Sequence, residues 1–148
     1  MKLTVRAFAQ TDLDLVRKNN CPSEAKLCAL RLAQSRKGLA ADFEGVFAGY
    51  AWGSVDTRLE RVHPKLGRGD ALLTDSFTLP AFRGRGIQTA LTIARFQLFH
   101  KLGYARAICT IATGNAASLA VWQIKLGSEV IGTIDFLRIG PWYKIRYN

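Results

Sequence analysis

The sequence has few acidic residues, few cysteines and no long apolar run. Eleven aspartates and glutamates face 21 lysines and arginines, which gives a formal net charge of +10. No apolar run is long enough to span a bilayer, and the N-terminal residues have no signal-peptide core, so we expect a cytoplasmic protein. The three cysteines match no metal-binding spacing and the two histidines are isolated, so we expect no disulfide and no metal site.

The composition fits one folded domain over residues 1–148. Hydrophobic residues make up 49% of the chain and charged residues 22%, a balance typical of globular proteins with a real core. The positive charge predicts attraction to anions. The basic residues are spread along the chain, and neither a zinc-finger spacing nor an aromatic RNA-reading signature is present, so we favour a basic solvated surface over a dedicated nucleic-acid site.

The stretch 71–102 organises the rest of the chain. Residues 71–79 alternate as a strand does, a loop rich in glycine and arginine follows, and a long amphipathic run comes next. Within that run, the spacing of three and four predicts one apolar helix face. Its members are Ile87, Leu91, Ala94, Leu98 and Leu102.

The loop before this helix has the chemistry of a phosphate site. Gly84 and Gly86 let a ligand approach the backbone, and Arg83 and Arg85 add positive charge. The first turn of a helix offers unpaired N–H groups to an anion. By pattern alone, a basic turn ahead of a surface helix fits equally well, and neither common nucleotide-binding glycine pattern is present.

The remaining elements alternate between strands and helices. We expect strands at 2–9, 40–43, 46–55, 104–111, 129–136 and 142–147, and helices at 11–18, from 23 onward, and at 116–126. A hairpin turn is expected at Glu44-Gly45, and 56–70 reads as a solvated basic loop.

Two motifs in order resemble the GNAT acyltransferase superfamily. Arg83-Gly84-Arg85-Gly86-Ile87 resembles its pyrophosphate loop, although Gln88 stands where Gly or Ala is usual. Downstream, Asn115, Ser118, Trp122 and Leu126-Gly127 resemble its second signature, with one extra residue before Leu126. The resemblance covers about residues 39–136. It implies an α/β (α+β) fold with a mixed, mostly antiparallel sheet of six or seven strands, splayed between strands 4 and 5 and flanked by about four helices.

The resemblance also implies an acetyl-CoA site. Backbone groups of strand 4 would bind the pantetheine arm, the glycine loop would hold the pyrophosphate, and the second signature would contact the arm again. The residues implied are Ser76, Phe77, Thr78, Arg83, Gly84, Arg85, Gly86, Ile87, Gln88, Thr89, Asn115 and Ser118.

The catalytic residues are the least determined part of the resemblance. Trp122 occupies the position of the tyrosine acid of many members, and since an indole cannot act as an acid here, we expect it to shape the pocket. Thr110 occupies the position of a strand-5 glutamate base. Asp75 is the nearest remaining candidate base, and Tyr143 is an alternative acid.

Three functions stay open at this point. The first is direct transfer of an acyl group, as a rule acetyl, from CoA to an amine of an unknown acceptor. The second is a catalytically inactive acyl-CoA-binding or sensor domain. The third, which we favour least, is a basic domain that binds polyanions or nucleic acid. A homodimer is also left open.

Overall fold

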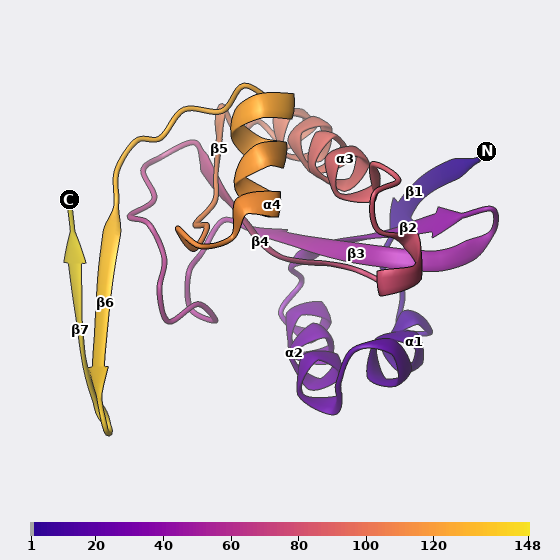
Figure 1. The fold of residues 1–148 in the computed structure, drawn as a ribbon, viewed down its shortest axis with the longest axis horizontal. Coiled ribbons are helices and arrows are strands. Elements are labelled where there is room, and N and C mark those ends of the chain that lie inside the picture. The colour runs from indigo at the N-terminus through magenta and orange to yellow at the C-terminus, as the bar shows by residue number, and fades with distance from the viewer. Residues whose placement is uncertain (1) are drawn as a thin grey trace.

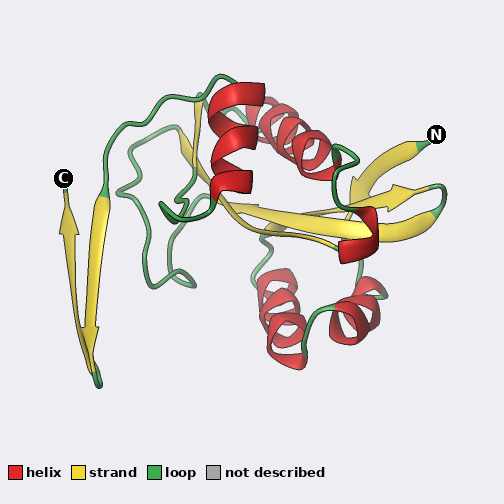
Figure 2. Ribbon diagram, viewed as in Figure 1, coloured by secondary structure: helices red, strands yellow, loops and turns green. Residues whose placement is uncertain are grey.

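The chain forms a five-stranded sheet with helices on both faces, and a separate two-stranded hairpin (Figures 1 and 2). The computed structural model describes residues 2–148. Its strands are β1 (Leu3–Ala7), β2 (Lys37–Phe43), β3 (Val46–Ser54), β4 (Asp70–Thr78), β5 (Arg106–Ile108), β6 (Ile134–Ile139) and β7 (Trp142–Tyr147). Its helices are α1 (Asp12–Asn19), α2 (Pro22–Ala33), α3 (Ile87–Lys101) and α4 (Ala116–Leu119), with a 3₁₀ turn at Pro80–Phe82 and a π-helical segment at Ala120–Lys125. Figure 1 shows α1 and α2 on one face of the sheet, and α3 and α4 on the other.

The strand order of the main sheet is β1-β2-β3-β4-β5. Neighbours are antiparallel except β4 and β5, which are parallel. The expected β2–β3 turn is confirmed: Glu44 and Gly45 both have positive φ, at 50° and 78°, as tight hairpin turns require.

Strands β4 and β5 separate after three residue pairs. Residues 70–72 pair with residues 106–108, and β4 continues to Thr78 without a β5 partner. The predicted strand 104–111 is therefore too long, because its later residues leave the sheet. This opening along β4 is the splay that the family resemblance implied.

The seven strands are divided between two sheets. β6 and β7 pair only with each other, whereas we expected one sheet of six or seven strands. The first of these strands begins at Ile134, not at residue 129, because the residues before it cross from α4 to the hairpin as a link without regular structure.

The buried face of α3 differs from the predicted one. Ile87 and Leu91 are buried as expected, but Leu102 is 48% exposed. The other buried positions of the helix are Thr92, Arg95 and Phe99. The helix is apolar around most of its circumference, so spacing alone could not select the face that packs. Among the described helices, none is both long enough and apolar enough to cross a membrane.

Candidate active site

A β-bulge in β4 sets the position of Asp75. The β3–β4 register moves from Ala51 opposite Ser76 to Trp52 opposite Thr74, which leaves Asp75 without an opposite residue. Its φ is 39°, in the left-handed region that non-glycine residues rarely occupy and that often marks functional sites.

The bulge reverses the side of the sheet to which the odd-numbered β4 side chains point. Before it, Ala71 and Leu73 pack with Phe99 of α3. After it, Asp75 contacts α2, and Phe77 joins the core on the α2 side. Strict alternation would have kept residues 71, 73, 75 and 77 on one face. The bulge therefore brings the Asp75 carboxylate to the α2 side.

Arg95 holds the bulge from the α3 side. Its Nη1 donates to the carbonyls of Trp52 (3.0 Å) and Thr74 (3.2 Å), the pair next to the bulge, and its Nη2 donates to Thr92 Oγ1. Arg95 is 2% exposed, and burial lowers its pKa to about 10, so it stays protonated at neutral pH. Sequence reasoning missed this role. The available signal was a charged residue flanked by apolar ones in the middle of a buried helix.

Asp75 shares its surroundings with Arg31 and Glu24 of α2. The guanidinium of Arg31, whose side chain is 4% exposed, pairs with the Asp75 carboxylate. Burial, followed by the nearby charge of Asp75, raises the pKa of Glu24. The negative charge of Asp75 thus disfavours the ionised form of Glu24. Nothing in the sequence pointed to Glu24, because α2 and β4 lie far apart in the chain.

The loop between β3 and β4 covers this cluster, and the expectation of a merely solvated loop is wrong for Glu60. Glu60 is 11% exposed, with one carboxylate oxygen 3.8 Å from Arg31 and the other 3.8 Å from Arg36. Neither oxygen has a hydrogen-bond partner. Between residues 2 and 148, no group of three or more His, Cys, Asp or Glu side chains is arranged to hold a metal ion.

The glycine loop lies at the end of β4 and leads into α3. Gly84 and Gly86 have φ of 76° and 75°, and a Cβ at either position would meet no atom within 4 Å. Gly86 is the N-cap of α3, and no side chain caps the helix. The backbone N–H groups of the first turn thus have no side-chain cap and can bind an anion.

Side chains around the loop fix its position. Gln88 Nε2 donates to Thr78 Oγ1 at 2.7 Å and Arg83 Nε donates to Thr78 O at 3.3 Å, so the end of β4 is tied to the start of α3. The Arg85 guanidinium lies over the rings of Phe43 (4.8 Å) and Phe82 (6.0 Å). The residue usual at position 88 of the motif, Gly or Ala, could not make this link.

The second motif forms a capped helix that continues as a π-helix. Asn115 Oδ1 accepts from Ser118 N at 3.1 Å and so caps α4. Further on, Leu126 N donates to Val121 O, five residues earlier. The π-helical turn accommodates the extra residue noted in the sequence. Trp122 packs edge-on against Phe96 of α3, with ring centroids 5.7 Å apart.

Tyr143 is not brought to this cluster. It lies in β7, outside the main sheet, is 58% exposed, and has the Arg61 guanidinium 5.9 Å from its ring. Tyr50 and Trp52, which share a face of β3, are both fully buried and pack with Phe8.

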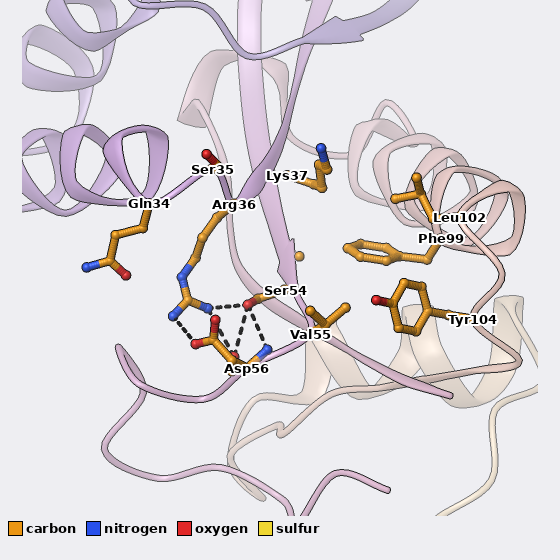
Figure 3. Close-up of a pocket in the computed structure, with 11 residues that line it drawn as sticks. Gln34, Ser35, Arg36, Lys37, Ser54, Val55, Asp56, Phe99, Leu102 and Tyr104 are labelled. Atoms are coloured by element: carbon orange, nitrogen blue, oxygen red, sulfur yellow. Dashed lines mark hydrogen bonds and ion pairs between the residues drawn. The ribbon is translucent and has the colours of Figure 1, made fainter. Parts of the chain in front are cut away.

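A hollow of about 300 Å³ lies at the other end of the sheet (Figure 3). Arg36, Ser54 and Asp56 form one wall, and Phe99, Leu102 and Tyr104 form another. In Figure 3 the Arg36 guanidinium is engaged by Ser54 and Asp56. Phe99 and Leu102 belong to the end of α3 opposite the glycine loop, about 20 Å from it at 1.5 Å per residue. This hollow contains none of the predicted site residues.

Comparison with known proteins gives a family match and solved structures of the same fold. The acetyltransferase (GNAT) family model matches residues 6–128. Among solved structures, the aminoglycoside N-acetyltransferase AAC(6')-Iy, in complex with a CoA bisubstrate analogue, has a TM-score of 0.73 at 23% identity, over 94% of this chain and 99% of that one.

Two further structures have the same fold. AAC(6')-Ih from Acinetobacter baumannii has a TM-score of 0.72 at 18% identity, over 94% of this chain and 99% of that one. The ribosomal-protein-S18-alanine N-acetyltransferase from Escherichia coli has a TM-score of 0.69 at 17% identity, over 99% of this chain and 90% of that one. No curated protein sequence gives a significant match.

Proposed function

The chain belongs to the acetyltransferase (GNAT) family, and from that premise we propose that it transfers the acetyl group of acetyl-CoA directly to an amine. One observation carries the proposal: a single strand, β4, links a bulged carboxylate to an open, uncapped helix N-terminus. An anion-binding end and a proton-accepting group thus lie along one half-unpaired strand.

The residues present fit acetyl-CoA. Backbone N–H groups from Gly84 to Thr89 would hold the pyrophosphate, with Arg83 and Arg85 supplying positive charge. The strand segment Ser76–Thr78 would pair with the pantetheine arm, because its edge toward β5 is unpaired. Asn115 and Ser118, at the start of α4, would contact the arm from the other side.

The chemistry needs a neutral amine and a departing thiol. The amine nitrogen forms a bond to the thioester carbonyl carbon, and the C–S bond breaks as the tetrahedral intermediate collapses. A β4 N–H donor stabilises the negative charge on the carbonyl oxygen. Asp75 accepts the proton lost by the amine, and the thiolate takes a proton from solvent.

We propose that the acceptor is a primary amine on a small cationic molecule of the amino-sugar type. The carboxyl groups of Glu60 and Asp75 lie on either side of the Arg31 guanidinium, with the Glu24 carboxyl beside Asp75, and their oxygens would accept hydrogen bonds from an ammonium group. AAC(6')-Iy and AAC(6')-Ih, both named as aminoglycoside acetyltransferases, are among the structures that match this fold. A protein N-terminus, as in the ribosomal-protein enzyme, is the competing acceptor.

Thiol release tests these assignments. With acetyl-CoA present, we expect release with an aminoglycoside panel and little with an N-terminal alanine peptide. Asp75→Asn should lower kcat by about 10²-fold, the lower end of general-base contributions, with little change in acetyl-CoA affinity. Asp14→Asn, on the exposed surface of α1, is the matched control. A normal rate for Asp75→Asn would remove Asp75 as the base, and release only with the peptide would remove the amino-sugar acceptor.

A non-catalytic acyl-CoA-binding domain is the second candidate. It is favoured by Trp122, which packs on Phe96 where many members carry a tyrosine acid, and by the distance of Tyr143 from the main sheet. Acetyl-CoA at a hundredfold excess over Kd should stabilise either candidate by about 2.7 kcal/mol. Stabilisation without thiol release for any amine would favour the binding domain. If acetyl-CoA does not stabilise the protein and a polyanion does, both candidates are excluded.

A further inference from the structure

The middle of the β3–β4 loop, residues 57–69, has no helix or strand and contains a single acidic residue, Glu60. Its basic residues are all exposed: Arg58, Arg61, Lys65 and Arg68. The Glu60 side chain, in contrast, is largely buried. The one carboxylate of this segment is therefore turned toward the protein, while the cations of the segment face solvent.

The Glu60 carboxylate lies between two buried guanidiniums. One oxygen is 3.8 Å from Arg31 Nη2, and the other is 3.8 Å from Arg36 Nη1. Arg31 belongs to α2 and Arg36 directly precedes β2, so both cations are attached to packed elements. Their side chains are 4% and 3% exposed. Because a buried charge that loses its partner is strongly destabilising, the two cations favour a loop position that keeps Glu60 between them.

The contact of Glu60 is ionic and contains no hydrogen bond. A separation of 3.8 Å is too long for one, and neither carboxylate oxygen has another hydrogen-bond partner. At the start of the loop, Arg36 instead donates to Asp56 Oδ1 at 2.5 Å and to Asp56 O at 3.0 Å. A buried carboxylate without hydrogen bonds has lost its hydration without full compensation. The segment around Glu60 can therefore open at lower cost than the segment around Asp56.

Arg31 connects Glu60 to the bulge in β4. Its Nη1 pairs with the Asp75 carboxylate, and its Nη2 faces Glu60. The guanidinium carbon lies 5.9 Å from the centre of the buried Trp52 ring. Because a guanidinium is planar and rigid, a rotation that moves one of its terminal nitrogens also moves the other. The position of Glu60 thus affects the direction in which Arg31 Nη1 meets Asp75.

We propose that Glu60 is a positioning residue, which closes the β3–β4 loop on Arg31 and Arg36 and thereby fixes the orientation of the Asp75 carboxylate. The inference rests on the proposed function, in which Asp75 accepts the proton of the amine. With the loop closed, Glu60 restrains Arg31, and Arg31 restrains Asp75. With the loop open, the Arg31 guanidinium can turn and Asp75 loses its fixed orientation.

Limited trypsin digestion measures the opening of the loop without any substrate. Trypsin cleaves after the four basic residues of segment 57–69, and cleavage there requires the segment to open locally. Glu60→Gln removes the charge and should increase the cleavage rate in this segment about tenfold, which corresponds to about 1.4 kcal/mol. The exposed Glu129→Gln is the matched control and should leave the rate unchanged. A native cleavage rate in Glu60→Gln overturns the proposal.

A second variant keeps the test independent of the folding of Glu60→Gln. Glu60→Asp retains the charge but is one methylene shorter, so its carboxylate lies farther from both guanidiniums. We expect its cleavage rate to rise about threefold, less than that of Glu60→Gln, because an ion pair weakens with distance. A native rate in Glu60→Asp overturns the proposal even where Glu60→Gln does not fold.

Thiol release then tests the positioning of Asp75. Glu60→Gln should lower kcat by at least about tenfold, since small displacements of a catalytic group are costly. Its affinity for acetyl-CoA in calorimetry should stay unchanged, and Glu60→Asp should recover part of the lost kcat. A native kcat in a Glu60→Gln chain whose loop is cleaved faster overturns the positioning role. If the native chain releases no thiol with any amine, the proposed acetyl transfer is wrong, whereas the cleavage rates still decide whether Glu60 closes the loop.

Discussion

Residues 3–108 and residues 109–148 are packed in different ways. The first region contains every buried residue of the described chain, and no residue after Ile108 is buried. The first region also carries the bulge, the acidic cluster and the glycine loop. The second supplies Asn115, Ser118 and an uncovered hairpin. The proposed anion-binding loop is thus joined to well-packed elements, while Asn115 and Ser118 belong to a region without a buried residue.

The largest expected effect is a difference in stability loss between two substitutions by alanine, one in each region. Leu91 is 0% exposed and Ile124 is 81% exposed. Leu91→Ala should lower the free energy of unfolding by about 2–5 kcal/mol, because it opens a cavity in the core. Ile124→Ala should change it by less than about 0.5 kcal/mol. Urea unfolding measures both, and equal losses would contradict the contrast.

The next effect tests whether the glycine loop binds the diphosphate. Gly86→Asp places a carboxylate beside the anion and should weaken CoA binding at least about a hundredfold, roughly 2.7 kcal/mol, in calorimetry. Gly45→Asp is the matched control, because Gly45 has nearly the same φ and equally open surroundings in the β2–β3 turn. Unchanged CoA affinity in Gly86→Asp would move the site elsewhere.

Replacing Arg95 should lower the free energy of unfolding more than replacing an exposed arginine on a helix. Arg95→Met keeps much of the apolar volume but leaves the carbonyls of Trp52 and Thr74 without their donor. We expect a loss of about 2–4 kcal/mol in unfolding free energy, since each buried unpaired group costs about 1–3 kcal/mol. Arg17→Met, on an exposed surface of α1, provides the comparison. A loss no larger than that of Arg17→Met would show that the bulge does not need the guanidinium.

The smallest expected effect is on how the free energy of unfolding changes with pH. The raised pKa of Glu24 means that the folded state binds its proton more tightly than the unfolded state, whose ordinary value is 4.5. Its contribution to stability is full below that value and is lost as pH rises through the raised folded pKa. Glu24→Gln should therefore flatten the decline in unfolding free energy on the alkaline side of pH 4.5. Exposed Glu129→Gln should leave the decline unchanged, and identical slopes in the two variants would contradict the assignment.

Most of the elements could be predicted locally. The Glu44-Gly45 turn, the order of strand, glycine loop and helix, and the Asn115 cap all depend on neighbours within a few residues. Backbone conformation and capping are decided over such distances. The acidic cluster could not be predicted in this way, because Glu24, Glu60 and Asp75 come from three separate segments.

The sequence by itself determined the loop that leads into α3, since two glycines and the residues beside them fix the backbone without help from the rest of the chain. Only the tertiary structure decided the face that Asp75 presents, the burial of Arg95 and the isolation of the β6–β7 hairpin. Each of these follows from strand pairing: a bulge turns a side chain over, freed carbonyls need a donor, and a hairpin joins a sheet only where an edge is within its reach.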